Sequence, residues 1–282
     1  MKGLATAFKE VYEEPLKERG FQRINMKHPV YARLIVGEIV HVITFEAVRS
    51  DELNPNIKAF EIVGGVATVY RGRMYLEATQ SSSYMYAVGL GRMYAVRASG
   101  KKDENYWDKI YKFHYDKTNE ESLEASIRFS YEAVERDLLP ELDNACSLEG
   151  ALDFLSKYKC PLRIFDEDSE FWKGINNHRY VEDEGLLYYV VYGKDKIDNF
   201  IGKKMFWQER YIEDWERMFL EGKWRQDVYE AEKNSSKEST QKFIDIYKKF
   251  VNTPELMDMV IKKIEEKKSL NQEILRSYGL DI

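Results

Sequence analysis

The chain has 282 residues, 44% hydrophobic and 33% charged, a composition typical of a folded globular protein rather than a disordered one. Its formal charge of −6 divides evenly, with −3 in residues 1–157 and −3 in the remainder, so neither half has the basic surplus of a nucleic-acid-binding domain. Charges are scattered through the first twenty residues, and the longest apolar run, LLYYVVY, is too short to cross a bilayer. We therefore expect neither a secretory signal nor a membrane span.

Two cysteines, Cys146 and Cys160, lack the spacing of a metal-binding or redox motif. This pattern indicates two reduced thiols, and with the missing signal it predicts a cytoplasmic protein.

The N-terminal residues have the spacing of an amphipathic helix, whose apolar face carries Phe8 and Leu16. Pro15 falls inside this pattern, so we expect a kink there or a short second helix starting at that proline. Gly20 ends the element, and Phe21 is the expected hydrophobic contact just past the cap.

From Val30 to Val96 the hydrophobic period changes to two, which predicts four or five successive strands. The joints between them are short and polar or contain glycine, which favours an antiparallel meander. Gly64–Gly65 lies inside a strand pattern and predicts a bulge or a close backbone approach. The predicted strands are PVYARLIV, EIVHVITFEAV, KAFEIVGGVATVY, RMYLEATQ and YMYAVGLGRMYAV.

The remainder is predicted to be mainly helical. Thr118 begins a helix with Glu121 as its capping-box partner, and Pro140 stops or kinks that helix before a short one at 147–157. LLYYVVY is either a strand or a buried helix segment. The next predicted helix has an aromatic ridge over 207–219, and a polar joint at KNSSKES separates it from a helix over 243–250. Thr253–Pro254 opens another helix. A last helix is capped by Ser269 and Gln272 and ends at Gly279.

These elements predict an α+β fold. An N-terminal helix packs on a mostly antiparallel sheet of four to five strands in a domain over 1–157, and an α-rich C-terminal region or extension follows over 158–282.

Four segments carry a family resemblance: LKERGFQR, EIVHVITFEA, FEIVGGV and ERDLLPELDNACSLEGALDFL, in this order. Over residues 3 to 157 the chain resembles a bacterial family known only as domain of unknown function 4304. The resemblance implies a helix-backed antiparallel sheet. The family pattern prefers glutamine where this chain has Glu46, and no catalytic residues are established for the family, so the resemblance assigns none.

His41 and Glu46 lie in one apolar run, HVITFEAVRS, and could be mistaken for an acid/base pair. Side chains alternate along a strand, so residues five apart point to opposite faces and cannot share a hydrogen bond. Both faces of the run are apolar, which predicts a central strand covered on both sides, with His41 as a core or cross-strand residue.

Glu46 alone is a candidate ligand-binding residue, because a carboxylate on an apolar face is costly unless it is paired. It either bridges to an arginine such as Arg33 or Arg73, or lies with Thr44 in a pocket that raises its pKa. These four residues form the predicted ligand-binding set.

Motifs for other chemistry are absent. His28, His41, His114 and His178 have no metal-ligand spacing, and DEDSEF lacks the glycine and glutamate of a calcium loop. No GxSxG occurs, and VGLGRM lacks the third glycine and the helix of a dinucleotide site. We therefore predict no catalytic residues, no metal and no cofactor.

The segment 91–117 interleaves basic and aromatic residues, a pattern that can bind single-stranded nucleic acid. Four acidic residues within it leave only a small basic excess, so a hairpin or helix edge with snorkelling lysines is favoured.

The chain also has 20 tyrosines, a residue type that suits protein interfaces. We predict an interface at Tyr84, Tyr86, Tyr94, Trp107 and Tyr111.

The leading function hypothesis is a non-enzymatic intracellular bacterial protein that acts by protein–protein contact, for example as an immunity protein against a toxin. The alternative is a small-molecule-binding protein or enzyme with a pocket around Glu46. The third is single-stranded nucleic-acid binding through 91–117.

Overall fold

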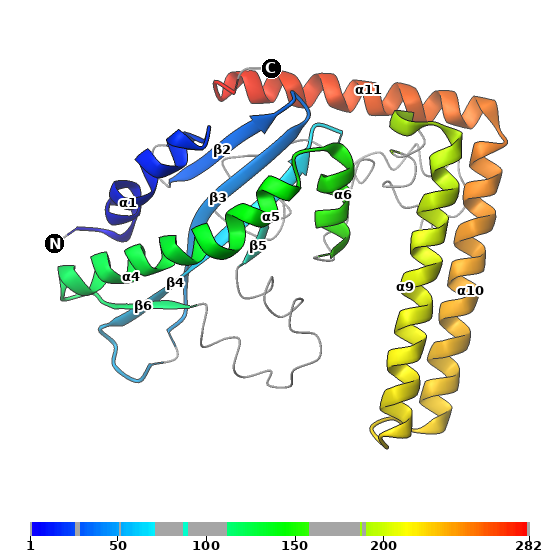
Figure 1. Ribbon diagram of the computed structural model, residues 1–282, viewed down its shortest axis with the longest axis horizontal. Helices are drawn as coiled ribbons and strands as arrows, with labels where there is room; N and C mark the ends of the chain where they lie inside the picture. The colour runs from blue at the N-terminus through cyan, green and yellow to red at the C-terminus, as the bar shows by residue number, and fades with distance from the viewer. Residues whose placement is uncertain are drawn as a thin grey trace. The chain divides into compact units, whose positions relative to one another are not determined.

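The computed structural model describes residues 2–25, 29–50, 52–70, 87–89, 112–157, 187 and 190–280 (Figure 1). The chain forms two compact units: unit 1 comprises Met1–Pro161 with Lys268–Ile282, and unit 2 comprises Leu162–Lys267. The described part of unit 1 combines an antiparallel sheet with helices, whereas that of unit 2 is helical. The predicted α+β fold class is confirmed.

Unit 1 is built on a six-stranded antiparallel sheet in the order β1-β2-β3-β4-β5, with β6 paired to β4. The period-two pattern predicted β2, β3 and β4, and β5 lies within the predicted strand YMYAVGLGRMYAV, whose other residues are outside the described part of the chain. The pattern missed β1 and β6, which have four residues each. The predicted strand at 73–80 lies outside the described residues. The strands are β1 (Gln22–Asn25), β2 (Val30–Ile35), β3 (Ile39–Val48), β4 (Ile57–Thr68), β5 (Ala87–Gly89) and β6 (Phe113–Asp116).

Strand β3 lies in the centre of the sheet between β2 and β4. Val40 and Val42 on one face and Ile43 and Phe45 on the other are each less than 5% exposed. The prediction of a strand covered on both faces is therefore confirmed.

Helix α1 (Leu4–Glu18) packs on this sheet through its predicted apolar face. The Phe8 ring lies 4.8 Å from the Phe45 ring of β3. The helix is a single segment through Pro15, so no second helix starts there. The end of α1 is as predicted: Gly20 has φ +80°, and the Phe21 amide donates to the Leu16 carbonyl at 2.9 Å.

Helix α4 (Glu120–Ala133) covers the same face of the sheet as α1 (Figure 1), and the two helices are joined by a 2.8 Å hydrogen bond between the Tyr12 and Ser130 hydroxyls. The helix begins one residue later than predicted, because the Asn119 side chain, not Thr118, accepts the amides of Glu121 and Ser122.

A π-helix, η1 (Val134–Leu138), connects α4 to α5 (Leu139–Asn144), and α6 (Leu148–Lys157) follows. Pro140 has no amide hydrogen, and its ring would clash with the carbonyl four residues earlier in a regular α-helix. The wider π turn just before it relieves that clash, so the chain continues as helix where a stop or kink was predicted.

Gly64 of β4 allows the helix layer to approach the sheet. A Cβ at this position would lie 2.4 Å from Leu138 Cδ1, and Leu138 is fully buried. The β3–β4 register runs without a shift through Gly64 and Gly65. Of the two predicted alternatives, the close approach is therefore correct and the bulge is not.

Unit 2 contains α9 (Lys194–Leu220) and α10 (Gln226–Val251), which pack together as an antiparallel hairpin (Figure 1). Helix α10 runs without a break through KNSSKES, so the predicted polar joint is wrong. Lysine, serine and glutamate are tolerated in a helix that has an apolar partner along one side. Of the LLYYVVY run, residues 187 and 190–192 are described, and they are helical.

Helix α11 (Pro254–Ser277) begins in unit 2 and ends in unit 1. Proline at its first position is as predicted, but the helix passes through Ser269 and Gln272 without a new cap. Inside unit 1, the buried Asn271 amide group donates to the Val69 carbonyl at 2.8 Å, and Lys268 contacts Glu38 at 3.1 Å. The C-terminal part of α11, from Lys268 on, therefore packs within unit 1.

We expect Gly64→Ala to destabilise unit 1 by about 1–3 kcal/mol, because buried Leu138 has no room to yield. The measurement is urea unfolding followed by near-ultraviolet circular dichroism. Gly202→Ala in α9 is the matched control: no atom lies within 4 Å of its added Cβ, and alanine favours a helix. Equal stability of the Gly64→Ala protein and the wild type would contradict this packing.

Candidate functional site

The predicted ligand-binding residues divide between the two faces of the sheet. His41 and Glu46 alternate to opposite faces of β3, and Arg33 is the cross-strand partner of His41. Arg33 therefore lies on the face opposite Glu46 and does not bridge to it. Thr44 shares the face of Glu46, and its hydroxyl donates to the Pro29 carbonyl at 2.8 Å. Arg73 lies outside the described residues.

Glu46 faces another carboxylate. Its register partner across the β3–β4 ladder is Glu61, and both side chains are partly exposed. Like charges directly opposite on neighbouring strands repel each other. Within the described part of the chain Glu46 makes no ion pair or hydrogen bond, so the pairing anticipated for it is not seen there. Two facing carboxylates are a source of repulsion but do not by themselves make a site.

Arg33 instead holds a network on the helix-covered face. Its Nε donates to His41 Nδ1 at 3.1 Å, and its Nη2 pairs with the Asp143 carboxylate of α5. A third bond, 3.2 Å long, goes from Nη1 to the Arg19 carbonyl at the end of α1, and the guanidinium lies 4.6 Å from the Phe21 ring centre. One side chain thus joins α1, β2, β3 and α5.

His41 is the buried member of this network, with an exposed fraction of 0%. Because Nδ1 accepts from Arg33, Nε2 carries the hydrogen and donates to the Ala145 carbonyl at 3.0 Å. Burial lowers the pKa of His41 to about 4, and the positive charge of Arg33 also favours the neutral ring. Both ring nitrogens are occupied and no substrate can reach them, so the residue is structural, as the sequence predicted.

A different cluster lies at the end of the α9–α10 hairpin. We call residues 212–233 the hairpin end. Gly222 has φ +71° and closes α9, and the Lys223 amide donates to the Met218 carbonyl at 2.9 Å. Across the turn, the Trp215 and Trp224 rings stack with centroids 5.9 Å apart, and the Phe219 and Tyr229 rings stack at 5.1 Å.

The hairpin end leaves apolar side chains in solvent. Leu220 is 77% exposed and Val228 is 42% exposed, while both tryptophans are only partly buried. Exposed aliphatic groups beside aromatic rings are typical of protein-binding surfaces. The charged residues nearby pair locally: Arg217 with Asp214, Lys223 with Glu221, and Arg225 with Asp227.

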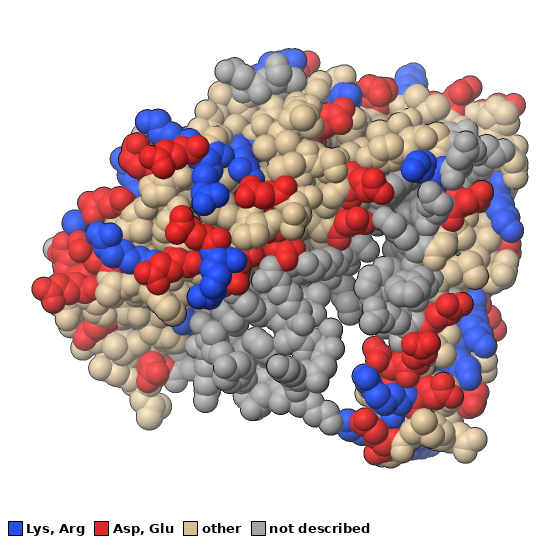
Figure 2. Space-filling model, viewed as in Figure 1, with Lys and Arg blue, Asp and Glu red and all other residues tan. Residues whose placement is uncertain are grey.

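The hairpin end is acidic overall. Residues 212–233 contain 7 Asp+Glu and 4 Lys+Arg, a net charge of −3. Figure 2 shows carboxylates, cations and uncharged atoms mixed on the visible face of the hairpin. The arrangement can bind a partner that is basic and offers an apolar contact, and it has no nucleophile or acid/base pair in a cavity.

The hairpin end was not predicted from the sequence as a binding site, although part of the residue pattern that marks it is present there. The aromatic ridge over 207–219 was predicted as a helix face, but nothing marked its last turn as exposed. Gly222, followed by Trp224 and a new helix, was the available signal for a helical hairpin with aromatic residues at its end. The predicted interface residues Tyr84, Tyr86, Tyr94, Trp107 and Tyr111 lie outside the described residues, so that interface stays a prediction.

Among the described residues, no three histidine, cysteine, aspartate or glutamate side chains lie close enough together to hold a metal ion. No described helix combines the length and the apolar character that a bilayer span requires.

Comparisons with known proteins found no matching family model, no similar curated protein and no similar solved structure. The resemblance to domain of unknown function 4304 therefore stays a prediction.

Unit 1 should lose stability as the pH falls from 6.5 towards 4. The unfolded His41 titrates near 6.5 and the folded one near 4, so between these values the unfolded chain binds the extra proton. The total contribution is roughly 3 kcal/mol, present above pH 6.5 and lost below about pH 4. The measurement is urea unfolding at several pH values for the wild type and His41→Gln, whose amide can keep both hydrogen bonds. A difference between the two proteins that stays constant across the window would contradict the assignment.

Replacing Glu46 by glutamine should raise the free energy of unfolding at pH 7 by about 0.2–1 kcal/mol, because it removes the repulsion from Glu61. In the matched control Glu38→Gln we expect the free energy of unfolding to fall, since Glu38 pairs with Lys268 and accepts from the Tyr70 hydroxyl. Chemical denaturation checks both. A loss of stability in Glu46→Gln would indicate that this carboxylate has a stabilising partner.

Proposed function

We propose that the protein acts by protein–protein contact and that the hairpin end binds a basic protein. The observation that carries this proposal is the exposed apolar pair Leu220 and Val228, set beside the stacked Trp215 and Trp224 within an acidic surface. Tryptophan is one of the residues that supply most of the binding energy in protein interfaces, because it buries a large area at small entropic cost.

The charge of the site selects the class of partner. A surface of net charge −3 repels nucleic acid and anionic lipid, whereas it attracts a basic protein and speeds the encounter. The three local ion pairs hold three of the four cations of the site close to neighbouring carboxylates. The remaining carboxylates of the hairpin end, including Glu213 and Glu232, therefore dominate the field that a partner meets.

An immunity-type role is the concrete form of this proposal: a cytoplasmic bacterial protein that binds and neutralises a basic toxin domain. Such a role needs tight contact but no catalytic group. It is supported by the acidic surface and by the apolar contact residues at the hairpin end.

The test is capture of partners by the tagged full-length chain from lysate of its source organism at moderate salt, followed by mass spectrometry. We expect a stoichiometric basic protein, whose affinity for the purified chain falls as salt rises. Replacing Leu220 and Val228 together by serine should weaken its binding at least tenfold, because two exposed apolar contacts are lost.

Leu53→Ser is the control, because Leu53 of unit 1 is an exposed apolar residue (101%) that lies far along the chain from the hairpin. Its binding should equal that of the wild type. Unchanged binding by the double serine variant would exclude the hairpin end as the interface. Absence of any stoichiometric partner would overturn the proposed function itself.

A further inference from the structure

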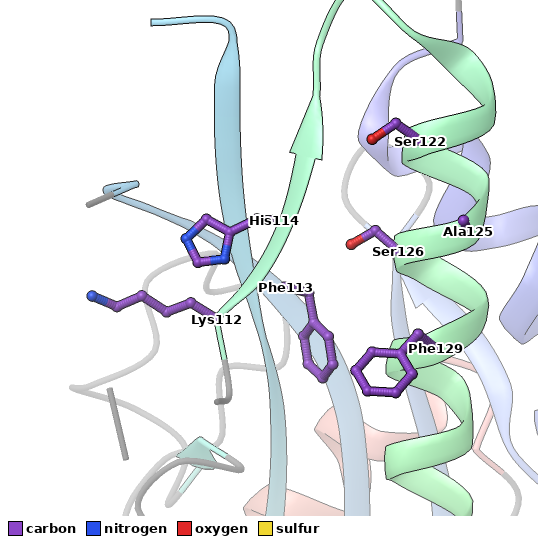
Figure 3. A pocket seen from close by; sticks show the side chains of 7 residues that line it. All are labelled: Lys112, Phe113, His114, Ser122, Ala125, Ser126 and Phe129. Atoms are coloured by element: carbon purple, nitrogen blue, oxygen red, sulfur yellow. The ribbon is translucent and has the colours of Figure 1, made fainter. Parts of the chain in front are cut away.

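The pocket between strand β6 and helix α4 of unit 1 has a volume of about 420 Å³ (Figure 3). The Lys112 and His114 side chains point to one side of β6, whereas Ser126 reaches towards the strand from α4 on the other side (Figure 3). These polar groups do not converge, so the pocket defines no ligand. At the hairpin end, in contrast, aromatic rings and exposed carboxylates occur together.

Trp224 lies in the turn between α9 and α10 and is partly exposed. Its ring stacks on the Trp215 ring, with the two planes inclined by 24°. One ring can cover only one of the two faces of another ring. Within the described residues Trp224 makes no further ring contact, cation contact or hydrogen bond. The second face of Trp224 is therefore available to a partner.

The cations of the hairpin end are bound elsewhere. Three of the four, Arg217, Lys223 and Arg225, form the local ion pairs. Arg225 follows Trp224 directly, but its guanidinium donates to both carboxylate oxygens of Asp227. The fourth cation, Lys233, donates to the Tyr229 hydroxyl at 3.1 Å. None of these four side chains lies over Trp224, so the hairpin end does not cover this ring with a cation of its own.

The charge around the ring selects a cation. Four of the seven carboxylates of the hairpin end are exposed and form no ion pair within the described part of the chain. Their potential attracts a positive group and repels a carboxylate. The face of tryptophan is the strongest aromatic acceptor for a cation. The four carboxylates belong to Glu213, Glu216, Glu230 and Glu232.

The site favours arginine over lysine. A guanidinium is planar and weakly hydrated, so it can lie flat on an indole ring at a smaller cost in hydration than an ammonium group. The aliphatic stem of arginine also covers apolar surface. Leu220 and Val228 offer such surface: they are 77% and 42% exposed and lie four residues before and four residues after Trp224.

We infer that the partner anchors an arginine side chain on the open face of Trp224. The guanidinium stacks on the indole ring, and the exposed carboxylates of the hairpin end balance its charge. This inference rests on the proposed function, because it names the side chain by which the hairpin end recognises a basic protein.

The test uses the full-length chain and the peptide acetyl-Gly-Arg-Gly-Arg-Gly-Arg-amide, together with its lysine and citrulline analogues. Binding is followed by NMR through the indole N–H resonance of Trp224, which is assigned as the resonance lost in Trp224→Leu. We expect the arginine peptide to bind about threefold or more tightly than the lysine peptide of equal charge, because the guanidinium stacks better. The citrulline peptide has no charge and should give no saturable shift at about 20 mM.

Trp224→Leu should abolish the preference for arginine over lysine, while the weaker attraction due to charge alone remains. The Lys223 amide resonance measures both affinities in this variant. Phe129→Leu is the matched control: it removes an aromatic ring that is 57% exposed but belongs to α4 of unit 1, so the preference should persist. Circular dichroism confirms that both variants are folded.

Equal affinity of the arginine and lysine peptides for the wild type would overturn the arginine anchor. A preference for arginine that survives in Trp224→Leu would overturn it as well. The proposed function fails on a different result, the absence of any stoichiometric partner in the capture experiment, so the two failures are distinguishable.

Discussion

Strand β3 is buried on both faces from Ile39 to Phe45, so a polar group on this stretch needs a partner inside the protein. His41 meets this requirement with Arg33 on one nitrogen and the Ala145 carbonyl on the other. Because those partners lie on β2 and at the end of α5, the histidine fixes the helix layer against the sheet. The same requirement keeps the ring neutral, since a proton on Nδ1 would face the guanidinium directly.

Among its described residues, unit 2 has no buried polar side chain comparable to His41. Two helices bury only the faces they share, and Tyr229 is the one buried side chain among those described on α10. The residues that follow it on the inner side of α10 include Lys233, Ser236 and Thr240, which contribute little apolar burial. Among the described side chains, Phe219 of α9 and Tyr229 of α10 join the two helices by a ring contact at the hairpin end. The same aromatic residues that join the helices also leave apolar surface for a partner.

The hairpin end is acidic overall and its apolar groups stand in solvent, which fits a macromolecular partner. This follows from the elements that build it, because a helical hairpin exposes side chains at its end.

Much of the local structure was determined by the sequence alone. Hydrophobic alternation placed β2, β3 and β4, and the pattern around Gly20 located the end of α1, because both signals depend on neighbours close in the chain. The same reasoning failed at KNSSKES and at Ser269, where a helix that packs along its length overrides a weak local stop signal. It also missed β6, whose four residues are a strand only because β4 lies beside them.

The candidate sites were decided by the tertiary structure. Arg33 was proposed as a partner for Glu46, but the strand register turns it towards His41 and Asp143 instead. Residue spacing along one chain determines which face a side chain occupies. Only the packing of distant segments determines what that face meets, because hydrogen bonds and charges act through space and not along the sequence.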